Sequence, residues 1–281
     1  MAITGGLKLF KKSKCAFSEG ASMVATSGDA SSPNAIDRNF TSYWRSVGST
    51  DAITETLIVN LVGNVTIDRI FLIDHNFKSY NVKYLSGGTY THFSNVVGID
   101  GSMANITEST YARDTSYYEF TPVTTTSLQI EVTTTQTVNT EKYLNLFIAT
   151  EEMGTLTGFP KIKNLVVDRN IRKKEMLSGK SLILKSEESF SVELDFDSYP
   201  ASSNYHADID LAFSLFDIED NFIIWLCGGR TGSNYFKKEL RGFRLKDVYT
   251  VQLAANLKLA YINSTYKNPV DFTLKLEEVV D

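Results

Sequence analysis

The chain has 281 residues, of which 42% are hydrophobic and 22% are charged, and its formal net charge is −5. These proportions exclude a disordered chain, and no region is basic enough to indicate nucleic-acid binding. The two cysteines, Cys15 and Cys227, are too few and too far apart for a disulfide scaffold. No apolar segment has the length that a transmembrane helix needs, so we expect no membrane insertion.

The first half of the chain carries short apolar runs that are typical of β-strands. Each run is rich in β-branched, aromatic or aliphatic residues and is bounded by Gly, Asn, Ser or Asp. The predicted strands are Leu57–Leu61, Ile67–Ile73, Val82–Leu85, Tyr117–Phe120, Leu128–Val132 and Tyr143–Ile148.

A change of pattern at Met153–Pro160, which holds two glycines and a proline, predicts a boundary between two domains, 1–153 and 154–281. The second domain is also expected to be rich in strands, with one short helix near 208–216 that begins with acidic residues. A charged turn, Asp168–Lys174, is expected to separate its first two strands. The strands predicted here are Lys161–Val167, Lys180–Leu184, Phe190–Phe196, Phe222–Cys227, Tyr249–Leu253 and Asp271–Leu276.

Groups that could support catalysis are sparse in this sequence. The three histidines, His75, His92 and His206, lie at no metal-pair spacing and in no nucleophile or zinc-protease motif. The paired glycines lack the spacing of a phosphate-binding or dinucleotide-binding loop. We therefore predict no catalytic residues, no enzymatic activity and no cofactor.

The densest basic segment contains Arg169, Arg172, Lys173 and Lys174. Nucleic-acid binding is one interpretation, but the segment is short and has no interleaved aromatic residues. A solvated hairpin tip is the second interpretation, and an arm that pairs with an acidic surface of a neighbouring subunit is the third. The net negative charge favours such self-association, and we treat these four residues as candidates for assembly.

Tyr43, Trp44 and Arg45 are the candidates for ligand binding. An exposed ring beside planar polar groups is the arrangement that a sugar site requires. A Trp just before a strand is more typical of the core of a β-sandwich, so the core is the favoured place for Trp44.

The segment from about 16 to 154 resembles the discoidin-like, or coagulation-factor type C, family of galactose-binding-like domains. Ala35, Asp37, Asn39 and Trp44 stand in the order of the family's Ala-x-Asp-Gly-Asn-x-x-Thr-x-Trp loop, with Arg38 where the family often has Gly. The resemblance implies a mainly β fold, an antiparallel jelly-roll sandwich.

Some relatives in that family bind a structural calcium ion through this loop. The resemblance implies that Asp37, Asn39 and Thr41 are the oxygen donors here, with Glu151 or Glu152 as a late acidic ligand. An arginine inside the loop weakens this hypothesis, because it places a positive charge beside the ion.

A second resemblance is to structural proteins of tailed bacteriophages, on the strings TSYWRS, IDRIFLIDHN and GTLTGFPKIKN. The N-terminus lacks the apolar core of a secretory signal, so we expect synthesis in a host cytoplasm and release by lysis. The resemblance implies a virion component of the tail tip, baseplate or fibre attachment, whose partners are other tail proteins and copies of itself. The alternative is a carbohydrate-binding module that recognises a host glycan; an enzyme with an appended module is the least favoured.

Overall fold

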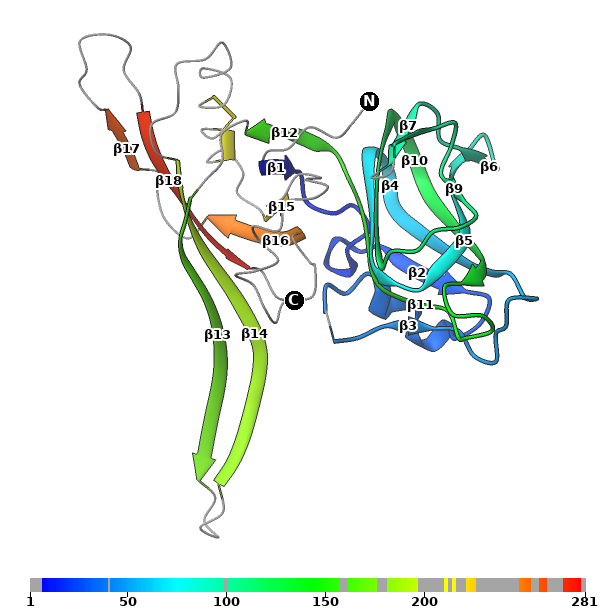
Figure 1. Ribbon diagram of the computed structural model, residues 1–281, viewed down its shortest axis with the longest axis horizontal. Coiled ribbons are helices and arrows are strands. Elements are labelled where there is room, and N and C mark those ends of the chain that lie inside the picture. Colours follow the sequence, from blue (N-terminus) through cyan, green and yellow to red (C-terminus); the bar gives the residue numbers. More distant parts are fainter. Residues whose placement is uncertain are drawn as a thin grey trace.

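The computed structural model describes residues 7–39, 41–98, 101–156, 161–175, 181–196, 210–211, 214–215, 221–225, 248–253, 258–261 and 270–278. These residues form two sheets in which the paired strands run antiparallel (Figure 1). The prediction of a mainly β fold is therefore confirmed. Across the described ranges, no helix has the length and apolar character that a membrane crossing needs.

The first sheet has ten strands and contains the predicted strands of the first half. Two pairs of predicted strands are each a single long strand, β4 and β10, which pair with each other on both sides of the unpaired residues 61–64. Register shifts near Glu119 and Thr125 let this long pair bend. The strands are β2 (Ser22–Ala25), β3 (Trp44–Arg45), β4 (Glu55–His75), β5 (Phe77–Ser86), β6 (Thr89–His92), β7 (Val96–Gly98), β8 (Gly101–Met103), β9 (Thr107–Glu108), β10 (Thr115–Thr135) and β11 (Tyr143–Thr150).

Because β4 and β10 bend, this sheet folds into the two layers of a β-sandwich. The early half of β4 pairs with β2 and with the late half of β10, whereas its late half pairs with β11 and the early half of β10. Ile70 and Leu72 point into the core between the layers, and their neighbours Phe71 and Ile73 lie in a separate cluster on the opposite face. The predicted sandwich is thereby confirmed.

The second sheet combines strands from both ends of the chain in the order β12-β1-β15-β16-β18-β14-β13, with β17 beside β18. The predicted boundary between 153 and 154 falls inside β12, and β1 from the N-terminal segment lies between β12 and β15. The predicted helix coincides with helical residues at 210–211 and 214–215. The strands are β1 (Leu7–Phe10), β12 (Glu152–Leu156), β13 (Lys161–Glu175), β14 (Ser181–Phe196), β15 (Phe222–Trp225), β16 (Val248–Leu253), β17 (Lys258–Tyr261) and β18 (Val270–Glu278).

A long two-stranded ribbon of β13 and β14 extends from the second sheet (Figure 1). The turn predicted at Asp168–Lys174 is wrong, because these residues are part of β13. They continue the ladder with β14, for example Arg169 opposite Glu188 and Arg172 opposite Leu184. Strand pairing thus overrides a locally charged composition. β18 pairs with β14 only over 191–196, so within the described strands the outer ribbon pairs with itself alone.

An apolar cluster joins the outer face of the sandwich to the second sheet. Trp225 of β15 packs against Phe71 and Tyr117, with ring centroids 5.8 Å and 4.5 Å away. Burial of these rings provides most of the apolar contact. The cluster consists of Phe10, Phe71, Ile73, Tyr117, Leu146, Ile148, Ile223 and Trp225.

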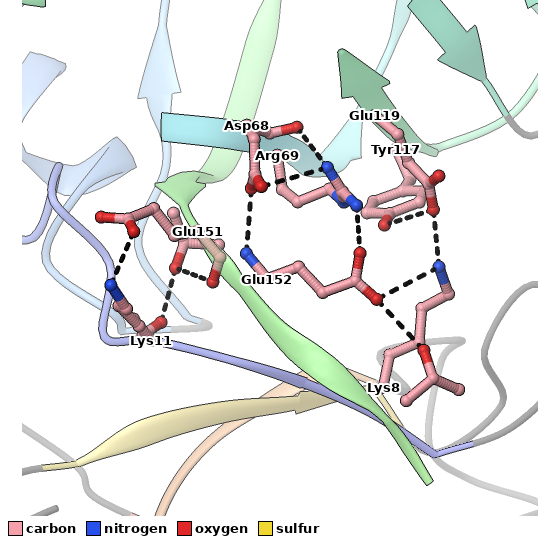
Figure 2. A network of polar contacts seen from close by, with 10 residues as sticks. Lys8, Lys11, Asp68, Arg69, Tyr117, Glu119, Glu151 and Glu152 are labelled. Atoms are coloured by element: carbon pink, nitrogen blue, oxygen red, sulfur yellow. Dashed lines mark hydrogen bonds and ion pairs between the residues drawn. The ribbon is translucent and has the colours of Figure 1, made fainter. Parts of the chain in front are cut away.

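A network of ion pairs borders this apolar cluster (Figure 2). Lys8 Nζ of β1 lies 2.5 Å from a carboxylate oxygen of Glu119, which also accepts a hydrogen bond from the Tyr117 hydroxyl at 2.8 Å. Arg69 of β4 pairs with Glu152 of β12. Burial alone would raise the pKa of Glu119, but the ammonium of Lys8 and the Tyr117 hydroxyl hold it below its ordinary value. The network therefore ties β1 and β12 to the sandwich by charge as well as by packing.

Candidate functional site

The loop that precedes β3 is organised by its own polar side chains. The Asp37 carboxylate accepts hydrogen bonds from the Asn39 backbone N–H at 2.8 Å and from the Ser42 hydroxyl at 2.9 Å. The side-chain oxygen of Asn39 accepts from both the backbone N–H and the hydroxyl of Thr41, at 2.9 and 2.7 Å. Short Asp and Asn side chains commonly close turns in this way.

Of the predicted calcium ligands, Asp37, Asn39 and Thr41 lie together in this loop, whereas Glu151 and Glu152 pair with basic residues elsewhere. Asn39 and Thr41 bond to each other, and Thr41 is exposed. Glu151 pairs with Lys11, and Glu152 pairs with Arg69 in the network of Figure 2. Among the residues that the structure describes, no group of three His, Cys, Asp or Glu side chains could hold a metal ion. The oxygens of Asn39, Glu151 and Glu152 that the family resemblance implies as ligands are therefore engaged with other groups of the protein.

Arg38 adopts a backbone conformation that favours glycine. Its φ is 60°, in the left-handed region that glycine adopts without strain. Its buried guanidinium donates a hydrogen bond to the Ser18 hydroxyl at 2.8 Å. The loop therefore carries a buried positive charge of its own, which disfavours a bound cation.

Trp44 belongs to the core of the sandwich. Its side chain is 0% exposed, its ring meets the edge of Phe77, and its indole N–H donates to the Ser27 carbonyl at 3.0 Å. No face of the indole is open to a ligand. Of the three ligand candidates, Trp44 is therefore a structural residue.

Tyr43 and Arg45 lie together at the surface, and a third residue, Tyr143, joins them. Arg45 of β3 is the direct cross-strand partner of Tyr143 at the start of β11. The exposed Arg45 guanidinium lies over both rings, 5.1 Å from the Tyr43 centroid and 5.4 Å from that of Tyr143. The rings meet edge to face with their centroids 5.7 Å apart. Such cation–π contacts hold the guanidinium in a fixed orientation.

An acidic residue completes this group, which we name the Arg45 platform: Tyr43, Arg45, Asp74 and Tyr143. The Tyr43 hydroxyl donates to the Asp74 carboxylate at 2.7 Å. Asp74 has φ 53°, a strained conformation for a non-glycine residue that often marks functional positions. The platform therefore presents ring edges, a cationic donor and an anionic acceptor on one surface.

Sequence reasoning identified Tyr43 and Arg45 but missed Asp74 and Tyr143. Asp74 lies in the LIDHN string, and Tyr143 opens the predicted strand YLNLFI, so both lay at visible strand ends. Sequence alone does not reveal that β3 pairs with β11, and this pairing is what brings Tyr143 beside Arg45.

His75, next to Asp74, is buried and structural. Its Nδ1 accepts the Phe77 backbone N–H at 3.1 Å, and its Nε2 lies 2.7 Å from the Ser116 hydroxyl. Burial lowers the pKa of His75 to about 3, so the imidazole is neutral at physiological pH. This histidine shapes the chain after β4 and does not act as an acid or base at neutral pH.

The four assembly candidates, Arg169, Arg172, Lys173 and Lys174, all lie on β13 in the outer ribbon. Their cross-strand partners on β14 include both an acidic and several apolar residues. The structure therefore places them together on one projecting element, away from the Arg45 platform in sequence and in sheet.

Comparisons with known proteins return structures but no sequence relatives. No family model and no curated protein matches this chain. Similar solved structures include a chitosan-binding module from a Paenibacillus chitosanase/glucanase, at 19% identity over 49% of this chain and 97% of the module, with a TM-score of 0.38. Another is the family 32 carbohydrate-binding module of Clostridium perfringens NanJ in complex with galactose, at 19% identity over 50% and 98%, with a TM-score of 0.39. At these values the likeness carries no argument about function.

Proposed function

We propose that the N-terminal sandwich is a carbohydrate-binding module whose binding surface is the Arg45 platform. The observation that carries this proposal is the exposed Arg45 guanidinium, held over the rings of Tyr43 and Tyr143 beside the Asp74 carboxylate. The proposed role is attachment, and it requires no catalytic group.

The chemistry of the platform suits a polyhydroxylated ligand. A guanidinium donates several N–H groups in a plane, and a carboxylate accepts hydrogen bonds from hydroxyls, so neighbouring sugar hydroxyls have partners of both kinds. Tyrosine rings supply rigid apolar area beside these polar groups. Because stacking and cross-strand pairing already orient Arg45, little side-chain entropy is lost on binding.

A glycan array tests this proposal with the whole chain. We expect the wild-type protein to bind a subset of glycans, and Arg45→Ala and Tyr143→Ala to lose that binding while circular dichroism shows an unchanged fold. Arg113→Ala, which also removes an exposed arginine from the sandwich, is the matched control and should bind normally. A wild-type protein that binds no glycan, or variants that bind as well as the wild type, would contradict the proposal.

A second proposal is a structural role in a bacteriophage tail, with the outer ribbon of β13 and β14 as the contact to neighbouring subunits. Its support is the ribbon itself, since the outer strands pair with each other alone within the described ladder, and the outer part of β13 carries the four basic candidates in a chain of net charge −5. An extended two-stranded element with a basic segment on one strand suits contact with an acidic surface of another copy or of another tail protein.

Charge reversal on the ribbon tests this second role. Glutamate at Arg172, Lys173 and Lys174 together should reduce the mass measured by light scattering, because it replaces attraction to an acidic neighbour by repulsion. Arg45→Ala serves as the control, since it leaves the ribbon unchanged. Assembly that is the same in the triple variant and the wild type, or a wild type that is monomeric alone and with tail proteins, would contradict it. Neighbouring genes for tail tube and baseplate proteins are the expected genomic context.

A further inference from the structure

Asn145 of β11 makes an unusual contact with the loop that the family resemblance assigns to calcium. Its side chain is 0% exposed. Its amide nitrogen donates hydrogen bonds to two backbone carbonyls of the loop, those of Ser42 at 2.5 Å and Asn39 at 3.4 Å. Asp37 closes the same loop by accepting a hydrogen bond from the Ser42 hydroxyl. Two backbone oxygens of the loop therefore accept hydrogen bonds from one buried amide.

These oxygens can serve an amide or a cation, but not both at once. A primary amide has two N–H donors, which match the two carbonyls, and it is neutral. A calcium ion needs six to eight oxygen ligands, so an N–H group that points into the site would oppose it. The Asn39 carbonyl also accepts hydrogen bonds from the backbone N–H and the hydroxyl of Ser42, at 3.2 and 3.0 Å. The Ser42 carbonyl is therefore the loop oxygen for which the Asn145 amide is the main donor.

We propose that the Asn145 amide takes the place of a cation beneath this loop, so that the loop and the adjoining Tyr43 are held without calcium. Asn145 is thus a positioning residue for the Arg45 platform. The predicted consequence is a wild-type protein whose stability is indifferent to calcium, unlike relatives of the same fold that bind the ion. The buried guanidinium of Arg38 acts in the same direction.

A single isosteric substitution should reverse this arrangement. Asn145→Asp replaces the amide nitrogen by oxygen and adds a carboxylate to a loop that already holds that of Asp37, so the donors become hard oxygens. Without calcium the new carboxylate faces carbonyl oxygens, which is repulsive. With calcium the same oxygens become ligands.

Thermal unfolding in EDTA, in millimolar calcium and in millimolar magnesium tests the proposal. Wild-type Tm should be the same in all three solutions. Asn145→Asp should melt roughly 5 °C or more below wild type in EDTA and recover most of that loss in calcium. Asn145→Leu, which removes the donors without adding oxygens, should be destabilised equally in all three. Asn60→Asp, an exposed change of the same kind, is the control and should show no calcium response.

The unfolding measurements distinguish results that support the proposal from results that overturn it. If Asn145→Asp is unfolded in EDTA, its refolding on addition of calcium is the supporting result, and failure to refold overturns the proposal. A wild-type Tm that rises in calcium but not in magnesium overturns it as well, as does a calcium response in Asn145→Leu. None of these measurements uses a glycan, so they stand apart from the test of carbohydrate binding.

Discussion

Replacement of Trp44 by alanine should strongly destabilise the sandwich, although Trp44 adjoins the proposed binding surface. The indole is 0% exposed, and its N–H is the donor to the Ser27 carbonyl. Removal of a buried Trp side chain costs about 3–5 kcal/mol, and the loss of its hydrogen bond costs about 1 kcal/mol more. Because 1 kcal/mol shifts the Tm of a domain of this size by roughly 2–4 °C, a fall of roughly 8 °C or more is expected.

Urea denaturation followed by far-UV circular dichroism measures this loss without relying on tryptophan fluorescence. Trp44→Phe keeps an aromatic ring in the core and should lose about 1–3 kcal/mol, chiefly through the unpartnered Ser27 carbonyl. Tyr43→Ala, at the half-buried neighbouring position, is the control for the surface and should cost less than Trp44→Ala. A Trp44→Ala variant as stable as the wild type would refute the assignment of this residue to the core.

Three further predictions concern charge and burial. His75 is protonated near its ordinary pKa of 6.5 in the unfolded chain but only near 3 in the folded chain. The free energy of unfolding should therefore fall as pH drops from 6.5 towards 3, by at most about 1.4 kcal/mol per pH unit. In urea titrations at several pH values, His75→Gln should reduce this dependence of stability on pH. The pKa of Glu119 is lowered in the folded chain, so its ion pair with Lys8 stabilises the fold above the ordinary carboxyl pKa, and this stabilisation is lost in acid. Lys8→Met should therefore destabilise the protein more at neutral pH than at pH about 3. An equal loss of stability at both pH values would contradict the pairing. Burial raises the pKa of the Cys15 thiol, so native protein should resist alkylation at neutral pH and react only when unfolded, as mass spectrometry can measure.

Much of the sandwich could be predicted because its information is local. The β-branched, aromatic and aliphatic residues of Leu57–Leu61 and Ile67–Ile73 identified strands, and the structure places both in β4. Sequence could not show that they are one strand, since Gly63 and Asn64 look like a turn until β10 is seen to pair with β4 on both sides of them, at Asn60 and at Val65. The same limit produced the wrong turn at Asp168–Lys174, where pairing with β14 decides the conformation.

The candidate site was only half visible for a related reason. Tyr43 and Arg45 are close in sequence and could be named. Tyr143 is far from them in sequence and joins them only because β11 pairs with β3. The late acidic ligands of the calcium hypothesis met the same limit. Glu151 pairs with Lys11, just after β1, and Glu152 pairs with Arg69 of β4, whereas the polar residue that reaches the loop is Asn145.

The binding affinity of the Arg45→Ala variant tests the central claim most directly. Isothermal titration with a glycan that the wild-type chain binds should show at least about a tenfold loss of affinity, equivalent to about 1.4 kcal/mol, because the variant removes the charged donor that the two tyrosine rings hold in place. The Arg113→Ala control should bind within about twofold of the wild type, a difference of about 0.4 kcal/mol. Equal affinity of Arg45→Ala and wild type would contradict the account, because the Arg45 platform would then not be the binding surface.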